Sequence, residues 1–394
     1  MQTRGRRGLD EGMRSLDRQA LREALLDARQ YTKALVDDLS DAQWRVPILP
    51  TINPVAWEIG HVGWFMERWC LRERGLQPGP SRVADADRMY DSSAIAHADR
   101  WRLPLPPRPA TLRYVDEVLA ATLEALEDAG ESDRGLYGFR LALYHEDMHA
   151  ESFAQLRQEL GYPAPARLGS SSDRAPAGGD ARLDGGEFEM GAQQGASGFV
   201  FDNEKWAHPV RVSPFAIARR PVLEGEFLAF VEDGGYRRDA LWSAEGRAWR
   251  DAGGAAQPLY WRRANRSWER RVFDRWEPLR PDVPMQHVNA HEAEAYCRWA
   301  GRRLPSEAEW EFAALAGSIE WGGSVWEWTS TSFAPYPGFS ADPYRDYSEP
   351  WFHTHRSVRG GSTVTTARLA HPRFRNFYLP HRNDIFAGFR TAAY

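Results

Sequence analysis

Three histidines are the side chains whose type and spacing best suit chemistry. His145 and His149 stand four residues apart in the segment YHEDMHAE, and two such side chains on a helix share one face at about 5–6 Å. That separation lets two imidazoles converge on one metal ion. His61, in the segment IGHVGW, is the third candidate ligand, and its flanking glycines leave room for a neighbouring backbone. Three neutral imidazoles with open coordination positions suit iron, zinc or copper.

The same segment leaves two other interpretations open. The stretch from His145 to His149 also has the form H-E-x-x-H, in which Glu146 would be the general base of a zinc hydrolase. A histidine pair on an acidic helix face can also be merely solvated. Because the pattern is short and often arises by chance, the remainder of the chain has to separate these interpretations.

The elements that must position these histidines are helical. Apolar residues recur close to every 3.6 positions through much of the first region, and Asn53-Pro54 and Gly161 supply start and stop signals. Ser40 is expected to cap a short turn. Four helices joined by loops favour a bundle, and the long connection at 76–108 is typical of a functional loop. The predicted helices are at 15–39, 55–73 (ending near Gly75), 110–129 and 135–160.

A change in composition separates this region from the remainder of the chain. Residues 163–180 are rich in Pro, Ala, Gly and Ser, which indicates a linker. Beyond the linker, short strand-like pieces alternate with turn signals, so an irregular α+β domain with little regular structure is expected. The predicted strands are at 188–190, 210–212 and 215–217, and the predicted helices are at 223–234 and 290–301.

Composition excludes several classes of function. The 394 residues carry a formal net charge of −5 with scattered basic residues, so no nucleic acid partner is expected. Two cysteines, Cys70 and Cys297, do not make a disulfide framework, which favours a reduced, cytoplasmic setting. No apolar run approaches the roughly 20 residues of a membrane helix, and no secretory signal is evident. The 17 tryptophans indicate a loop-rich core or a pocket for a cation.

The second region carries several phrases of a known domain. Together they resemble the formylglycine-generating-enzyme-like domain, a fold related to C-type lectins, over most of residues 181–394. Formylglycine-generating enzymes use a late cysteine pair that this chain lacks, so that activity is not expected. The phrases are GGEFEMG at 185–191, FDNE at 201–204, GRRLPSEAEWE at 301–311, VWEWT at 325–329, VRGGS at 358–362 and GFR at 388–390.

The first region resembles a DinB-like four-helix bundle with the pattern H-x3-H-x-E. A DinB-like bundle at 13–162, joined by the linker at 163–180 to a formylglycine-generating-enzyme-like domain at 181–394, is similar to the ergothioneine sulfoxide synthase family. The resemblance implies an enzyme that uses Fe(II) and O2 to join sulfur to the imidazole C2 of hercynine, which is Nα-trimethylhistidine. A related branch, the selenoneine synthases, joins selenium from a selenosugar. The zinc hydrolase then becomes a remote alternative.

The resemblance also implies the roles of single residues. The family's three iron ligands fall on His61, His145 and His149. Glu151, which ends the H-x3-H-x-E pattern, is expected either to orient one of these rings or to be an exposed helix carboxylate. Spacing indicates only the pair His145 and His149, with His61 as a third candidate, and the resemblance implies all three as the ligand set.

Two tyrosines in the segment YRDYS match the family's catalytic stretch. Tyr344 corresponds to its catalytic tyrosine, a neutral proton donor that steers the reaction toward bond formation rather than thiol dioxygenation. Tyr347 is expected to contact hercynine. The trimethylammonium of hercynine needs an aromatic face or a carboxylate, and Tyr347 or Trp326 could supply that face.

The substrate loop departs from the ergothioneine branch. Its residues here are Asn376, Phe377, Tyr378 and Arg382, where that branch has Asn-Trp-Asp with an arginine four residues beyond the Asp. In that branch the Asp and the Arg hold the ammonium and carboxylate of an amino-acid-like sulfur donor. Tyr378 removes the carboxylate and offers a flat face and one hydroxyl, which suits a sugar ring. The loop therefore favours a selenosugar over a cysteine or γ-glutamylcysteine thiol.

Met148 is a second departure, because the ergothioneine branch commonly has a Gln there that helps to hold hercynine. A thioether cannot donate a hydrogen bond but tolerates a polarizable neighbour. The loop at 89–101 also resembles the selenoneine branch, with Arg100 as a candidate donor contact. The expected protein is a cytoplasmic, O2-dependent, non-haem Fe(II) enzyme that forms carbon–selenium bonds, with carbon–sulfur bonds as the alternative. A structural Ca2+ in the second domain and the oligomeric state stay open, and a catalytically dead lectin-like module would bind no metal.

Overall fold

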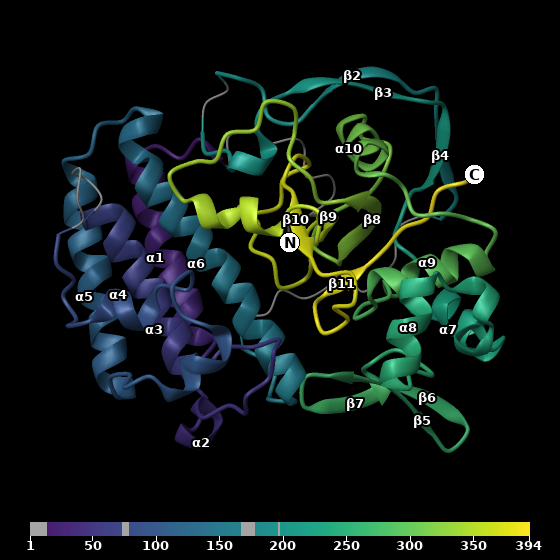
Figure 1. Ribbon diagram of the computed structural model, residues 1–394, viewed down its shortest axis with the longest axis horizontal. Coiled ribbons are helices and arrows are strands. Elements are labelled where there is room, and N and C mark those ends of the chain that lie inside the picture. The colour runs from purple at the N-terminus through teal and green to yellow at the C-terminus, as the bar shows by residue number, and fades with distance from the viewer. Residues whose placement is uncertain (1–13, 73–78, 167–177, 196–197) are drawn as a thin grey trace, which may run out of the picture.

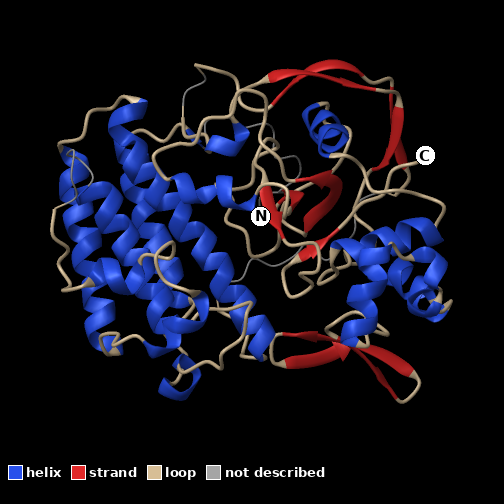
Figure 2. Cartoon of the chain, in the orientation of Figure 1, coloured by secondary structure: helices blue, strands red, loops and turns tan. Residues whose placement is uncertain are grey.

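The computed structural model describes residues 14–72, 79–166, 178–195 and 198–394. Long helices fill one side of the molecule, and the sheets with the remaining helices fill the other (Figures 1 and 2). A helical region is thus followed by a mixed region, in the predicted order. The predicted helix end at Gly75 and most of the predicted linker lie outside the described residues, whereas Asp180 already begins strand β1.

The helices of the first region begin and end close to the predicted residues. The side chains of Asp17, Ser40 and Ser132 accept hydrogen bonds from backbone N–H groups in the first turns of α1, α2 and α6. Gly161, at φ +64°, ends α6 in the left-handed conformation. The helices are α1 (Arg18–Ala34), α2 (Asp41–Trp44), α3 (Val55–Met66), α4 (Ala86–Tyr90), α5 (Arg108–Glu127) and α6 (Asp133–Leu160).

Helix α3, which carries His61, differs from the prediction. Its α-helical hydrogen bonding stops at Met66, and the chain continues as a π-helix over Glu67–Arg72. Such π segments are rare and frequently occur at functional sites. Gly60 is required by close packing, because a Cβ there would lie 2.3 Å from the ring of Tyr90. The space beside this glycine is therefore filled by a side chain and not, as the sequence predicts, by a neighbouring backbone.

Four long helices of the first region pack against one another. Helix α3 contacts α5 and α6, and α1 also contacts α5 and α6. Their apolar faces bury a core that includes Leu21, Val55, Val115, Leu119 and Phe139. Helix α6, with 28 residues, lies at the boundary with the second region (Figure 1). Neither α6 nor any other described helix has an apolar stretch long enough to cross a membrane.

The second region contains more regular structure than the sequence predicts. Its described strands form two antiparallel pairs, β1–β4 and β2–β3, a three-stranded sheet β5–β6–β7, and a sheet of order β10-β9-β8-β11 in which β11 is parallel to β8. The strands are β1 (Asp180–Leu183), β2 (Gly186–Met190), β3 (His208–Val212), β4 (Phe215–Ala218), β5 (Trp261–Ala264), β6 (Ser267–Val272), β7 (Arg275–Pro278), β8 (Trp326–Ser332), β9 (Arg356–Gly360), β10 (Asn376–Tyr378) and β11 (Ala387–Gly388).

Two of the four helices in this region were predicted, and two were not. The predicted ones are α7 and α9, and the unpredicted ones are α8 and α10. Most of the unpredicted strands are short, and their burial does not alternate cleanly, so no period of two residues emerges from the sequence. The helices are α7 (Glu224–Glu232), α8 (Ala244–Gly253), α9 (Ala290–Trp299) and α10 (Glu307–Leu315).

The two regions meet along α6. Arg368 of the second region pairs with the buried Asp147 at 2.6 Å, and the amide of Gln155 donates a hydrogen bond to the hydroxyl of Tyr378 at 3.3 Å. Because His149 lies on the same helix between these two contacts, the interface places residues of the second region beside the histidines.

Candidate metal centre

The three histidines lie together in the structure. His61 comes from α3, His145 and His149 come from α6, and one ring nitrogen of each lies within 4.8 Å of the others. The Nε2 atoms of His61 and His145 are 3.1 Å apart. Two nitrogen ligands at about 2.0–2.1 Å from one metal ion are separated by roughly 3 Å. Among the described residues, this is the one group of three such side chains with metal-binding geometry.

Two of the rings are held with their free nitrogens toward this centre. The Nδ1 of His61 lies 2.7 Å from the backbone oxygen of Tyr90, and the Nδ1 of His149 lies 2.7 Å from the carboxylate of Glu58. An oxygen acceptor requires that Nδ1 carry the hydrogen, so each neutral ring keeps a bare lone pair on Nε2. A cation satisfies lone pairs that converge in this way. The residues present therefore fit a metal ion held by three imidazoles, two of which are oriented by hydrogen bonds.

Burial keeps the rings of His61 and His145 neutral. Desolvation lowers the pKa values of His61 and His145 well below their usual 6.5, and the nearby His149 lowers both further. Aromatic side chains form the walls: Trp57 stacks on His61 with centroids 4.8 Å apart, and Phe65 stacks on His145 at 3.6 Å. Because only a deprotonated imidazole nitrogen binds a metal, these rings are ready for metal at neutral pH.

Glu146, the base that the zinc hydrolase interpretation requires, faces away from the histidines. It is fully buried, and its carboxylate receives hydrogen bonds from Arg29 of α1 at 2.8 and 3.2 Å. Successive residues on a helix point about 100° apart, so Glu146 meets a different neighbour from His145. The zinc hydrolase interpretation is therefore wrong, because its sequence pattern does not bring the glutamate to the metal centre.

Glu151 orients no histidine ring, contrary to one expectation, and it is not exposed, contrary to the other. Its carboxylate accepts hydrogen bonds from the indole of Trp326 at 2.6 Å and from the hydroxyl of Thr365 at 2.7 Å. Desolvation raises the pKa of Glu151 to about 7. Glu58 is the carboxylate that orients a ring. Trp326 is fully buried, so it offers no aromatic face to a ligand.

Tyr344 lies beside the histidine group. Its ring is edge-on to Phe65 at 5.0 Å and to His145 at 6.4 Å. Burial raises the pKa of Tyr344, so the phenol keeps its proton at neutral pH, and the side chain of Ser92 forms a hydrogen bond with it. Ser92 belongs to the loop at 89–101, so a loop of the first region meets the candidate catalytic residue of the second.

Tyr347 and Met148 meet where the two regions join. The hydroxyl of Tyr347 donates to Sδ of Met148 at 3.7 Å, and its ring stacks on Phe201 at 4.6 Å. Met148 directly precedes His149 on α6. The structure thus brings both of these predicted substrate contacts close to the histidines.

The predicted substrate loop divides between two faces of β10. Asn376 and Tyr378 share one face, and the hydroxyl of Tyr378 accepts hydrogen bonds from Asn376 at 3.5 Å and from Gln155 of α6 at 3.3 Å. Gln155 lies six residues beyond the second helical histidine, which is ~9 Å along the helix. Phe377 points to the other face and stacks on Phe333 at 4.1 Å. Asn376 and Tyr378 thus lie against α6, whereas Phe377 supports the strand from behind.

Arg382 already has a partner. Two of its nitrogens donate to the carboxylate of Asp384 at 2.6 and 2.5 Å, and its guanidinium carbon lies 5.8 Å from the centre of the Tyr378 ring. Its charge is therefore neutralised within the protein, and an incoming carboxylate would have to compete with Asp384.

The loop at 89–101 closes over α3. The guanidinium carbon of Arg100 lies 4.0 Å from the centre of the Trp57 ring, the same ring that stacks on His61. Arg100 also donates to the side chain of Asn53 at 2.7 Å. The Asn53-Pro54 signal correctly predicts that a helix starts here, but the side chain of Asn53 does not cap α3. Sequence reasoning also missed three polar partners of the site, namely Glu58, Tyr90 and Ser92. Each of them contacts a site residue on an element that is distant along the chain.

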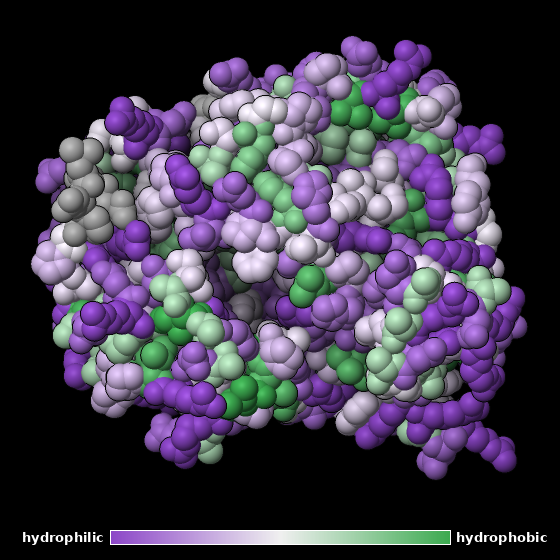
Figure 3. Space-filling model, viewed as in Figure 1, coloured by the Kyte–Doolittle hydropathy of each residue, from purple (hydrophilic) through white to green (hydrophobic). Residues whose placement is uncertain are grey.

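Figure 3 shows a hollow in the surface between the helical side and the sheet side. Separately, a small cavity is lined in part by Tyr344 and Tyr347. The cavity combines aromatic rings with the carboxyl groups of Asp202 and Asp342, of which Asp342 is paired with Lys205 at 2.7 Å. Aromatic faces beside the remaining carboxyl group can attract an organic cation. The other lining residues of this cavity are Tyr137, Leu141, Phe199 and Phe201.

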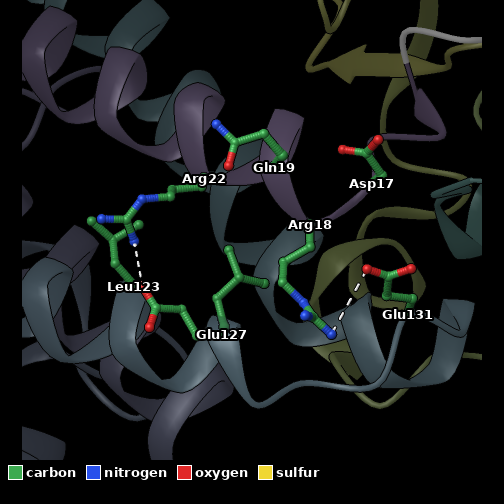
Figure 4. A pocket seen from close by; sticks show the side chains of 8 residues that line it. Asp17, Arg18, Gln19, Arg22, Leu123, Glu127 and Glu131 are labelled. Carbon is green, nitrogen blue, oxygen red and sulfur yellow. Dashed lines mark hydrogen bonds and ion pairs between the residues drawn. The ribbon is translucent and has the colours of Figure 1, made fainter.

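A larger pocket lies elsewhere, between the start of α1 and the end of α5 (Figure 4). Arg22 pairs with Glu127 at 3.4 Å, and Arg18 pairs with Glu131 at 3.8 Å. No histidine lines this pocket, and its charged side chains neutralise one another across it. It is therefore not the candidate site, in spite of its size.

Comparisons with known proteins agree with the two-region architecture. The DinB superfamily model matches residues 24–153, and the sulfatase-modifying factor enzyme 1-like domain model matches residues 166–321 and 316–394. Hercynine oxygenase of Mycolicibacterium thermoresistibile is 35% identical over 95% of this chain and 95% of its own length. The hercynine oxygenase of Mycolicibacterium smegmatis is 34% identical over 95% and 99%, and a formylglycine-generating enzyme of Streptomyces coelicolor is 30% identical over 54% and 88%. By domain content and by identity over nearly its whole length, the chain belongs to the hercynine oxygenase family.

Proposed function

We propose that the chain is an O2-dependent, non-haem iron enzyme that forms a carbon–chalcogen bond at the imidazole C2 of hercynine. The observation that carries this proposal is the convergence of His61, His145 and His149, two of which, His61 and His149, have their rings oriented by a hydrogen bond at Nδ1. The names of the relatives support hercynine as the substrate. Fe(II) bound by these histidines would supply the redox chemistry with O2 and would bring the chalcogen beside C2.

Tyr344 is the proposed proton donor. Its phenol stays protonated at neutral pH because burial raises its pKa, and its hydrogen bond with Ser92 restricts the hydroxyl. Its ring lies 6.4 Å from that of His145. Because the ring lies beside the histidine group, the neutral phenol is placed to donate a proton to a substrate bound there. Phe65 and Trp57, which cover two of the histidines, keep bulk water away from that step.

We place the trimethylammonium of hercynine beside Tyr347, where the small cavity must widen to admit it. The cavity there is lined by the rings of Tyr137, Phe199 and Phe201 together with the carboxyl group of Asp202. Aromatic faces and a nearby carboxylate both stabilise a quaternary ammonium. We expect the imidazole of hercynine to point from this cavity toward the histidines.

For the chalcogen donor, we propose a selenosugar. Tyr378 presents a hydroxyl that accepts hydrogen bonds from the side-chain amides of Gln155 and Asn376. The charge of Arg382 is neutralised by Asp384. Neutral hydroxyl and amide groups suit a sugar, whereas an amino-acid donor needs a free cation and a free carboxylate. A cysteine or γ-glutamylcysteine thiol is the alternative donor, and both give the same type of bond at C2.

The test is a donor competition with defined metal content. Protein purified without O2 should contain iron or accept Fe(II), and His149→Ala should lose it while His97→Ala, whose ring binds the backbone oxygen of Ile52, should retain it. With hercynine, O2 and equal amounts of a selenosugar and γ-glutamylcysteine, we expect a selenium product. A sulfur product would show that the thiol is the donor and would refute the selenosugar proposal. Absence of any hercynine-derived product with iron-loaded protein would refute the proposed function itself.

A further inference from the structure

A second group of buried polar side chains lies farther along α6. The hydroxyl of Tyr260 and one carboxylate oxygen of Glu159 are buried without a hydrogen-bond partner, whereas the other oxygen of Glu159 accepts from Thr51 at 2.6 Å. Nδ1 of His287 is also unpartnered, although the backbone of Asp384 and Ile385 contacts its ring. Tyr260 is 5% exposed and His287 is 8% exposed. Their rings meet edge-on with centroids 4.8 Å apart. Buried polar atoms without partners are destabilising, so several of them in one place indicate a polar ligand.

Glu159 belongs to the same group by its position, because Arg271 donates to its backbone oxygen at 3.1 Å and the guanidinium carbon of Arg271 lies 4.5 Å from the centre of the Tyr260 ring. Burial raises the pKa of Tyr260, and the negative charges of Asp384 and Glu159 raise it further. Asp384 holds Arg382, whose guanidinium lies 5.8 Å from the Tyr378 ring. The group therefore adjoins the end of the substrate loop that faces α6.

The helix links this group to the metal centre. Glu159 lies four residues beyond Gln155, on the same face of α6, and Gln155 donates to Tyr378. Helical side chains lean toward the N-terminus of their helix, which brings the carboxylate of Glu159 back toward Gln155 and toward His149. Along α6, the group therefore lies beyond Tyr378, on the side away from the histidines.

The chemistry of these atoms selects hydroxyl groups. Glu159 accepts hydrogen bonds, the Tyr260 hydroxyl donates and accepts, and the ring of His287 is neutral because burial lowers its pKa to about 4. The neighbouring cations are occupied: Arg382 binds Asp384, and Arg271 donates to backbone oxygens. A ligand carboxylate would find no free cation among these neighbours, whereas hydroxyl groups can satisfy all three unpartnered atoms.

We propose that Glu159, Tyr260 and His287 form a subsite that binds the hydroxyl groups of the chalcogen donor, remote from the chalcogen itself. This subsite rests on the proposed function, and it would make these three residues determinants of donor specificity. It selects a neutral polyol over a zwitterionic amino acid by hydrogen bonding.

Equilibrium binding tests the subsite without turnover. The probe is 1-thio-β-D-glucose, titrated by calorimetry into iron-loaded protein under exclusion of O2. Loss of one buried hydrogen bond should weaken binding about fivefold in Tyr260→Phe. Tyr336→Phe is the matched control, because the Tyr336 hydroxyl is also buried without a partner. The Tyr336 ring lies in another part of the second region, with its centre 4.0 Å from the guanidinium carbon of Arg375. If Tyr260→Phe and Tyr336→Phe bind the probe equally, the subsite is refuted and the unpartnered atoms hold water.

Glu159→Gln distinguishes hydrogen bonding from charge. Glutamine still hydrogen-bonds a hydroxyl but cannot pair with an ammonium, so binding of 1-thio-β-D-glucose should change less than twofold. If Glu159→Gln instead weakens cysteine binding tenfold and leaves the sugar unchanged while wild-type protein prefers cysteine, the polyol subsite is overturned. Because binding is measured without O2, a failure of the proposed reaction would appear only in turnover with hercynine and is separable from these outcomes.

Discussion

Replacing Glu58 by glutamine tests how the metal centre is held. Glu58 is fully buried, and its carboxylate accepts the hydrogen bond from Nδ1 of His149 at 2.7 Å. A hydrogen bond to a charged group contributes about 1.5–3 kcal/mol, and loss of the partner behind a ligating histidine weakens metal binding roughly 10–100-fold. The two ranges agree, because about 1.4 kcal/mol corresponds to a factor of ten. Glutamine keeps an oxygen that can accept from Nδ1 of His149 but removes the charge, so we expect Glu58→Gln to raise the Fe(II) dissociation constant about tenfold, at the lower end of this range.

The assay is an anaerobic titration of metal-free protein with Fe(II) in competition with a chelator of known affinity. Glu67→Gln is the matched control, because Glu67 is also buried and follows α3, but its carboxylate binds Ser81 and Tyr114 and not a histidine. Urea unfolding of both variants separates a loss of stability from a loss of metal binding. An unchanged dissociation constant in Glu58→Gln, or an equal loss in Glu67→Gln, would refute the reasoning.

Three further predictions concern a glycine beside the metal centre, the proposed proton donor and a buried carboxyl group of α9. Gly60→Ala should reduce the free energy of unfolding and the iron affinity together, because a Cβ there would lie 2.3 Å from the ring of Tyr90, and the backbone oxygen of Tyr90 holds His61. Urea unfolding and iron titration measure the two effects, and wild-type values in both assays would contradict the prediction. Tyr344→Phe should lower the rate of hercynine coupling about 100-fold or more while iron binding is retained, with consumption of the donor measured beside the product; an unchanged ratio of coupled product to oxidised donor would remove the proposed proton donor. Burial raises the pKa of Glu292 from about 4.5 to about 7, so ionisation costs the folded protein increasing stability as pH rises from 4.5 through 7. Relative to wild type, Glu292→Gln should therefore gain up to about 3 kcal/mol between pH 5 and pH 8, and a difference in unfolding free energy that stays constant with pH would contradict this.

Most of the helical region could be predicted because its signals are local. The 3.6-residue period of apolar side chains, the caps at Ser40 and Ser132, and the left-handed Gly161 lie within or directly beside the helices they define. The strands of the second region could not be predicted in the same way. β11 has two residues and β10 has three, and each is stabilised by a neighbouring strand that is distant along the chain. Their pairing depends on partners that local periodicity does not reveal.

The sequence by itself determined that His145 and His149 share a face of α6, because that follows from the geometry of one helix. It also carried the family phrases that identify the second region. Only the tertiary structure decided that Glu58 orients a ring while Glu151 receives hydrogen bonds from Trp326, and that Glu146 faces Arg29. The physical reason is that helical periodicity sets the direction of a side chain relative to its own helix. Which charge or ring it meets in that direction depends on how the helices and the second region pack.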